Sequence, residues 1–135
     1  MSVFVSTRNE KETADARKAM INGLSQDGGL YAPLTVPKVD LKSLIDLNYS
    51  ETAKRIIHLW FDDLAFEDIA TCCDEAYLNH FDHESVAPVV KAGDTFIVEL
   101  FHGETCAFKD VALSVLPRML VKSMQIGRAS CRERV

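Results

Sequence analysis

The chain of 135 residues is long enough for one compact domain but not for two of ordinary size. Its formal net charge of −5 argues against a nucleic-acid partner, because contacts to phosphate need a basic face. No apolar run approaches the roughly 18 residues of a membrane span, and no signal-peptide pattern opens the chain, so we predict a soluble, cytoplasmic protein without a membrane partner.

The first third of the chain predicts short strands around one helix. Residues 2–8 contain β-forming residues and predict a strand, and the polar stretch that follows offers Thr13 as a helix cap. A helix is expected over 14–22, ending at Gly23, because glycine commonly closes helices. The two glycines that follow permit a tight turn, which should lead into a short extended piece at 30–32.

Two amphipathic helices are expected in the middle of the chain. Residues 39–48 predict a short helix, and Ser50 is expected to cap a longer one. Apolar residues then recur every three or four positions, which places them on one helical face: Ala53, Ile56, Ile57, Trp60, Phe61 and Leu64. The same pattern over 66–80 predicts a second helix, and two such helices in succession should pack as a helical hairpin.

Neither the cysteines nor the histidines form a metal-binding pattern. The cysteines fit neither a Cys-x-x-Cys site nor a disulfide framework, so we expect reduced thiols at Cys72, Cys73, Cys106 and Cys131. His80 and His83 lie on either side of Asp82, but a helix end and loop are expected there. We therefore predict no metal site in this segment.

A strand and a helix are predicted toward the carboxyl end. A turn is expected at 91–94, followed by a strand over 95–101. The segment 111–121 is apolar at nearly every position, which predicts a helix buried on most sides. Pro117 should kink or split this helix, because proline cannot donate the backbone hydrogen bond.

Lys109 is placed in or beside the first turn of that helix. A helix start favours anions, so a lysine there is either simply solvated or used chemically. The chemical use would be a Schiff base with an aldehyde cofactor, which requires an amine that loses its proton easily. The residues alone leave both interpretations open.

The segment Glu99-Leu-Phe-His-Gly-Glu-Thr-Cys-Ala-Phe-Lys-Asp110 resembles the pyridoxal-phosphate lysine segment of threonine synthases, although Glu104 stands where that family usually has proline. Further motifs resemble the amino-terminal domain of the same family, in the same order: Val5-Ser-Thr-Arg8, Gly23-Leu24, Asp27-Gly-Gly-Leu-Tyr-x-Pro33 and Val86-Ala-Pro88. The similarity extends from residue 1 to about residue 124. Several separate motifs in register are far more specific than any one of them.

The resemblance implies a fold and a site. The fold class would be α/β: a mostly helical amino-terminal domain with short strands (1–85), then the first strand and helix of a fold type II pyridoxal-phosphate domain (86–124). Lys109 would carry the cofactor as the catalytic residue, and Phe108 could pack near it. Asp110 is expected to serve the helix start, and Thr105 either donates a hydrogen bond near the site or stabilises the turn.

The resemblance also implies a reaction. Threonine synthases convert O-phospho-L-homoserine and water to L-threonine and phosphate, as carbon–oxygen lyases that use pyridoxal 5'-phosphate. The alternatives are another fold type II pyridoxal-phosphate enzyme or a non-catalytic interaction module derived from the amino-terminal domain. The resemblance implies no particular oligomeric state.

The last residues break the pattern. Residues 125–135 contain three arginines and one glutamate in an otherwise acidic chain, and the apolar periodicity stops. We interpret them as a non-native tail without a packed position, the rival interpretation being a basic tail for an acidic partner.

A phosphate cradle is also missing from the sequence. No glycine-rich segment of the kind that binds a cofactor phosphate follows Lys109. We therefore expect a truncated enzyme that is inactive as this fragment.

Overall fold

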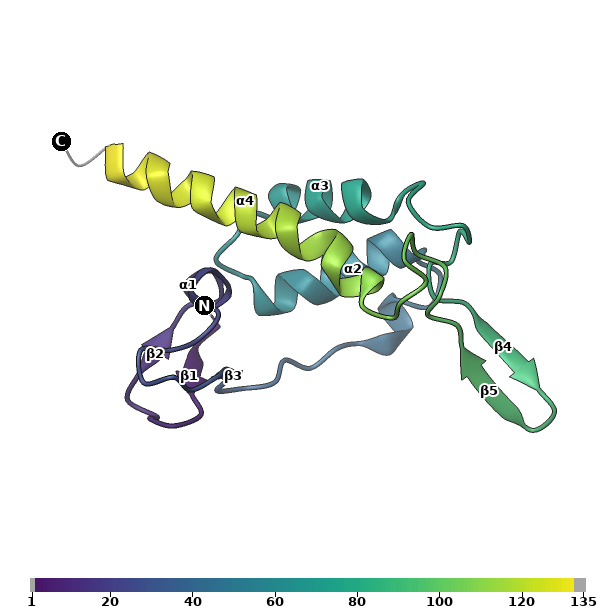
Figure 1. The fold of residues 1–135 in the computed structure, drawn as a ribbon, viewed down its shortest axis with the longest axis horizontal. Helices are drawn as coiled ribbons and strands as arrows, with labels where there is room; N and C mark the ends of the chain where they lie inside the picture. Colours follow the sequence, from purple (N-terminus) through teal and green to yellow (C-terminus); the bar gives the residue numbers. More distant parts are fainter. Residues whose placement is uncertain (1, 133–135) are drawn as a thin grey trace.

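Residues 2–132 are described by the computed structural model, with side chains given as far as Ile126. A small sheet with one short helix lies at one end, three helices pack together beside it, and a two-stranded hairpin projects at the other end (Figure 1). This arrangement confirms the predicted α/β class. The elements in chain order are β1 (Phe4–Ser6), β2 (Thr13–Ala14), α1 (Ala16–Asn22), β3 (Tyr31–Pro33), the 3-10 turn η1 (Leu41–Ser43), α2 (Tyr49–Trp60), α3 (Phe66–Tyr77), β4 (Val89–Ala92), β5 (Thr95–Val98) and α4 (Asp110–Arg132).

The amino-terminal sheet has the strand order β2-β1-β3, and both outer strands run antiparallel to β1. Phe4 pairs with Ala14 on one side and with Pro33 on the other. The pairing confirms the strand predicted within residues 2–8 and the extended piece predicted near 30–32.

The cap of α1 differs from the prediction. Thr13 pairs with Val5 in the sheet, so its backbone is already committed to β2. Asp15 caps the helix instead, and its carboxylate accepts a hydrogen bond from the Lys18 amide at 2.7 Å. Gly23 ends the helix, as predicted. The error of two residues arises because both side chains can cap, and sheet pairing decides between them.

The carboxylate of Asp27 closes the turn between α1 and β3. It accepts hydrogen bonds from the Ser25 hydroxyl, from the Ser6 hydroxyl at 2.8 Å and from the Gly29 amide at 2.8 Å. The Ser25 hydroxyl and then the Gly29 amide hold the pKa of Asp27 below its ordinary value. This turn is therefore attached to β1 as well as to its sequence neighbours.

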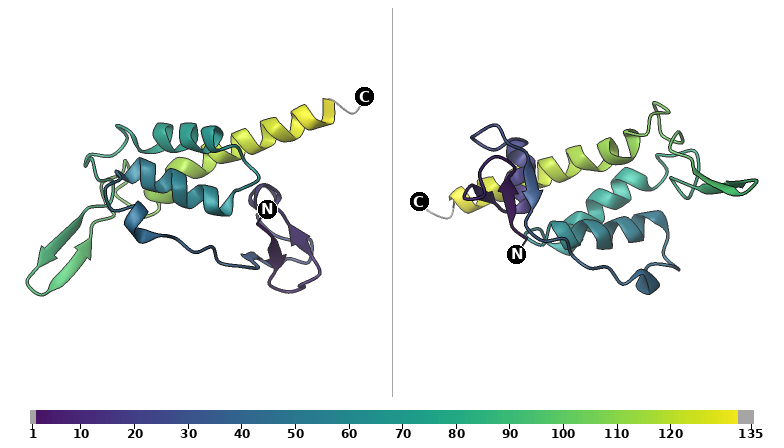
Figure 2. Two further views of the ribbon diagram at one scale, coloured as in Figure 1. Left: turned by 180° about the vertical axis from the view of Figure 1, so that it is seen from behind. Right: turned by 90° about the horizontal axis from the view of Figure 1, so that it is seen from below.

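The packed helices supply the main hydrophobic core. α2 and α3 form the predicted helical hairpin, and α4 packs on the other side of α3 (Figure 2). Because α3 contacts both neighbours, its apolar side chains are the most deeply buried. The buried members of the core are Leu64, Ile69, Cys72, Cys73, Ala76, Tyr77, Val86, Val115 and Met119.

The start of α2 also differs from the prediction. A short helix is expected over residues 39–48, but only the three-residue turn η1 forms there. Asn48 caps α2 by accepting a hydrogen bond from the Glu51 amide at 2.9 Å. Ser50, the predicted cap, is already inside the helix, and its buried hydroxyl donates to Asp74 of α3 at 2.8 Å. Ser50 thus joins two helices instead of ending one.

A buried cation reinforces the same contact. Lys54 is 7% exposed, and its ammonium lies 2.8 Å from the Asp74 carboxylate while also pairing with Glu51. The pairing with Lys54, and secondly the Ser50 hydroxyl, lower the pKa of Asp74. The charge is compensated on both sides, which a buried ammonium requires.

α4 is longer and more exposed than predicted. It continues through Pro117, because Val115 and Met119 on either side are buried and hold both flanking turns in place. Of the two predicted effects of Pro117, a kink or a split, the split does not occur. The helix is also not buried on most sides. A second apolar face is exposed, comprising Leu113, Leu116, Val121 and Met124.

The expected break at residue 125 is absent from the backbone. The helix runs on to Arg132, and the partly buried side chain of Ile126 packs against the core. The prediction that the tail lacks a packed position is wrong at Ile126, because the periodicity that buries Met119 also directs this side chain inward. The side chains from residue 127 onward lie outside the described residues.

The hairpin of β4 and β5 stands away from the helices in every view (Figures 1 and 2). Val89 pairs with Val98, and Ala92 pairs with Thr95. The turn is therefore tighter than the predicted 91–94, and the strand predicted over 95–101 ends at Val98. All eight residues of the two strands are exposed.

None of the helices in the described part of the chain combines the length and the apolar character needed to span a bilayer.

Replacing Ile69 with alanine should test the core. Ile69 is fully buried, so Ile69→Ala should lower the free energy of unfolding by about 2–5 kcal/mol, measured by urea denaturation. Ile45, which is 75% exposed, provides the control, and Ile45→Ala should change stability by less than about 0.5 kcal/mol. Equal losses in the two variants would contradict the described core.

Candidate functional site

Lys109 lies at the junction between the loop that follows β5 and the first turn of α4. Its backbone carbonyl accepts a hydrogen bond from the Leu113 amide at 2.8 Å, so the residue fills the capping position of the helix. The predicted order of strand, turn and helix start is confirmed. The Lys109 side chain is exposed, and so is the neighbouring ring of Phe108, at 65%.

The carboxylate of Asp110 organises this loop. It accepts hydrogen bonds from the Thr105 amide at 2.8 Å and from the Thr105 hydroxyl at 2.6 Å. These two bonds, with the hydroxyl contributing more, lower the pKa of Asp110. The Asp110 carboxylate therefore holds the loop against the first residue of α4, and Thr105 stabilises the turn, one of the two roles expected for it.

The loop is packed tightly around a glycine. A Cβ atom on Gly103 would lie 2.5 Å from the Asp110 Cβ and 2.6 Å from its Oδ2, closer than such atoms approach in proteins. Cys106 adopts a positive φ of 58°, and its amide donates to the Gly103 carbonyl at 3.1 Å. Only the smallest residue allows the loop to fold back on the start of α4.

His102 occupies the beginning of the loop. Its Nδ1 lies 2.5 Å from the Asp82 carboxylate and its Nε2 lies 2.8 Å from the Glu99 carboxylate. Sequence reasoning missed this arrangement, because Asp82 is twenty residues away along the chain. Only Glu99, three residues before His102, offered a local signal.

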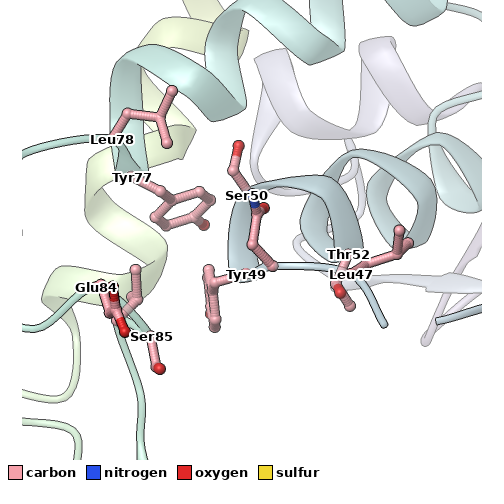
Figure 3. Close-up of a pocket in the computed structure, with 10 residues that line it drawn as sticks. Leu47, Tyr49, Ser50, Thr52, Tyr77, Leu78, Glu84 and Ser85 are labelled. Atoms are coloured by element: carbon pink, nitrogen blue, oxygen red, sulfur yellow. The ribbon is translucent and has the colours of Figure 1, made fainter. Parts of the chain in front are cut away.

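Two of the pockets near these helices differ in their relation to the 99–110 segment. One, of about 280 Å³, lies beneath the loop and is lined by Ala76, His80, Glu104, Thr105, Asp110, Leu113, Ser114 and Arg118. The other, of about 630 Å³, opens at the start of α2 and contains no residue of the 99–110 segment (Figure 3). The rings of Tyr49 and Tyr77 meet there edge to face, with centroids 4.9 Å apart. Among the described residues, no group of three or more potential ligands could hold a metal ion.

Comparison with known proteins relates the chain to one family. A family described as "Threonine synthase N terminus" matches residues 3–77. The threonine synthase of Pseudomonas aeruginosa is 35% identical over 87% of this chain, and that of Saccharomyces cerevisiae is 34% identical over 97%. The chain spans about a quarter of the length of these relatives, 26% and 28% respectively.

Two solved structures are similar as well. A threonine synthase from Brucella melitensis with bound pyridoxal phosphate superposes with a TM-score of 0.87 at 34% identity, covering 94% of this chain and 28% of its own. The yeast threonine synthase superposes with a TM-score of 0.83 at 32% identity, covering 94% of this chain and 27% of its own.

Replacing Gly103 with alanine should displace the Asp110 carboxylate. We expect Gly103→Ala to release the Thr105 amide, seen as faster hydrogen exchange there, and to cost about 1–3 kcal/mol of stability. Gly93→Ala is the matched control, because Gly93 has a positive φ of 62° but open space around it. It should strain only the hairpin turn. Unchanged exchange at Thr105 in Gly103→Ala would contradict the described packing.

Proposed function

This chain belongs to the threonine synthase family, and we propose that it provides the amino-terminal domain and the cofactor lysine of a pyridoxal-phosphate-dependent threonine synthase. The proposed reaction converts O-phospho-L-homoserine and water to L-threonine and phosphate. The observation that carries the proposal is the exposed Lys109 at the start of α4, within the segment that resembles the family's lysine motif. The proposed division is an amino-terminal domain over 1–85 and the start of the catalytic domain over 86–124.

The residues beside Lys109 suit such a cofactor. The lysine side chain is accessible, and the exposed ring of Phe108 offers an apolar surface against which a planar ring can pack. When bound, pyridoxal phosphate supplies an aldehyde that reacts with an amine and a ring that accepts electron density. Phe108 would limit the access of water to one side of that ring.

Lys109 would have two tasks. Its Nζ would hold the cofactor, and when free it would carry a proton to and from the substrate's carbon atoms. The backbone hydrogen bond to the Leu113 amide keeps the lysine at the end of a rigid helix. This anchoring supports orientation, which is worth roughly 7–11 kcal/mol in well-positioned reactions.

The neighbouring Asp110 is not a candidate acid or base. Both of its oxygens are engaged by Thr105, so the carboxylate holds the loop shape. A phosphate cradle made of backbone amides is also needed, and residues 110–132 form a continuous helix instead. We propose that another part of the full-length enzyme supplies it.

The proposed location is the cytoplasm. Cys72, Cys73 and Cys106 are free thiols, as is usual for proteins in a reducing compartment.

Borohydride reduction should test the cofactor lysine. In an enzyme of full family length that carries this sequence, peptide mapping should find the pyridoxyl label on Lys109. Lys109→Ala should remove the label and lower kcat by about 10²–10⁴-fold, the usual contribution of a positioned proton-transfer group. A label on Lys91 or Lys122 instead would contradict the assignment of Lys109 as the cofactor lysine.

The 135-residue chain by itself should not form threonine. It offers one covalent anchor for the cofactor, whereas catalysis needs the phosphate, the ring and the substrate to be held together. We expect no release of phosphate from O-phospho-L-homoserine and only loose, unspecific pyridoxal-phosphate absorbance. Robust phosphate release that Lys109→Ala abolishes would show that residues outside this chain are dispensable.

A further inference from the structure

The imidazole of His102 connects two segments that are far apart in sequence. Asp82 comes from the loop that follows α3, and Glu99 comes directly after β5. The His102 carbonyl also accepts a hydrogen bond from the Asp82 amide at 3.0 Å. The His102 side chain is only 12% exposed, which indicates a packed and not a solvated ring.

The segment that carries Asp82 is itself fixed to the core. Val86 is 2% exposed, and Phe81 packs partly against the buried cluster of α3 and α4. The ring of Phe81 also lies 6.1 Å from that of Tyr77, whose hydroxyl donates to the Val111 carbonyl of α4 at 3.0 Å. The backbone at Asp82 is therefore held near the core, whereas its side chain, which is 74% exposed, reaches out to the residue before the loop 103–109.

Both ring nitrogens of His102 face carboxylates, and this decides its charge state. An ionised carboxylate only accepts hydrogen bonds, whereas a neutral imidazole has a single N–H. Both contacts are satisfied together only by the imidazolium. In the neutral ring, one nitrogen lone pair would face a carboxylate without an intervening proton.

We propose that the imidazolium of His102 positions Lys109 by clamping the loop 103–109 to the helical core. The inference rests on the proposed function in that Lys109 is the cofactor lysine. His102 fixes the first residue of the loop, and Asp110 fixes its end through Thr105. The seven residues between these two anchors end at Lys109.

The clamp depends on pH in a direction that the contacts determine. The hydrogen bond with Glu99, and secondly that with Asp82, raise the pKa of His102 above its ordinary value of 6.5. The clamp is therefore complete below about pH 6.5 and is lost as the pH rises through the raised pKa. The other aromatic neighbours are Phe101, stacked with ring centroids 4.5 Å apart, and His83, at 5.1 Å. His83 is titratable too, and its Nδ1 accepts a hydrogen bond from the Ser85 amide at 3.1 Å.

Hydrogen exchange across a pH series tests the clamp in the full-length holoenzyme. The probe is the peptide that covers residues 103–109, with rates corrected by an unstructured reference peptide for the intrinsic effect of pH. In the wild type, protection should fall severalfold as the pH rises, with a midpoint above 6.5. In His102→Gln, protection should be low throughout and show no midpoint, because a glutamine can donate toward only one carboxylate and carries no charge.

Two variants that each remove one carboxylate charge, and a control, test which groups set the midpoint of the pH profile. Glu99→Gln and Asp82→Asn should each move the midpoint down toward 6.5, with the larger effect at Glu99. Glu84→Gln should leave it unchanged, because this exposed carboxylate lies in the same loop as Asp82 but is not one of the groups that shift the pKa of His102. A merely structural histidine would lower protection on mutation but would give no midpoint in the wild type.

The outcomes separate the two proposals. A flat wild-type profile, or a midpoint that persists in His102→Gln, overturns the clamp even if borohydride labels Lys109. A label elsewhere than Lys109 overturns the proposed function and with it the clamp's service to the cofactor. A wild-type midpoint that His102→Gln abolishes, together with a label on Lys109, supports both.

Discussion

The packing of α3 between α2 and α4 is the constraint on which the rest of the described structure depends. Ile69, Cys73 and Ala76 are completely buried because a helix covers each side of α3. The contact with α4 fixes where that helix begins, and the start of α4 fixes Lys109. The loop after α3 carries Asp82 back to the same region. The core formed by α2, α3 and α4 thus determines the position of Lys109.

Local sequence patterns predicted those parts of the fold that local interactions decide. The helical hairpin, the glycine at the end of α1 and the strand–turn–helix around Lys109 all follow from residues close in sequence. The caps were misplaced because Thr13 and Ser50 can cap a helix as well as Asp15 and Asn48 can. Pairing with β1 and contact with α3 made the choice, and neither is visible in a short window.

The site shows the same division. The role of Lys109 as the cofactor lysine stays a prediction, but its position beside a helix start could be predicted from the residues around it. The contact of His102 with Asp82 could not, because it depends on how the loop after α3 meets the end of β5. Whether Pro117 would split α4 could not be decided from the sequence for a similar reason, since the burial of Val115 and Met119 on both sides of it holds the helix together.

The cysteines differ in burial, so their reactivity reports on the opening of the fold. Burial raises the pKa of the Cys73 thiol to about 12, whereas Cys106 is exposed on the lysine loop. Because the thiolate is the form that reacts, an alkylating reagent should modify Cys106 promptly and reach Cys73 only when α3 separates from its neighbours. The rate at which Cys73 is modified, relative to the rate at Cys106, would then report how often α3 separates from its neighbours. No label has to be introduced for this measurement.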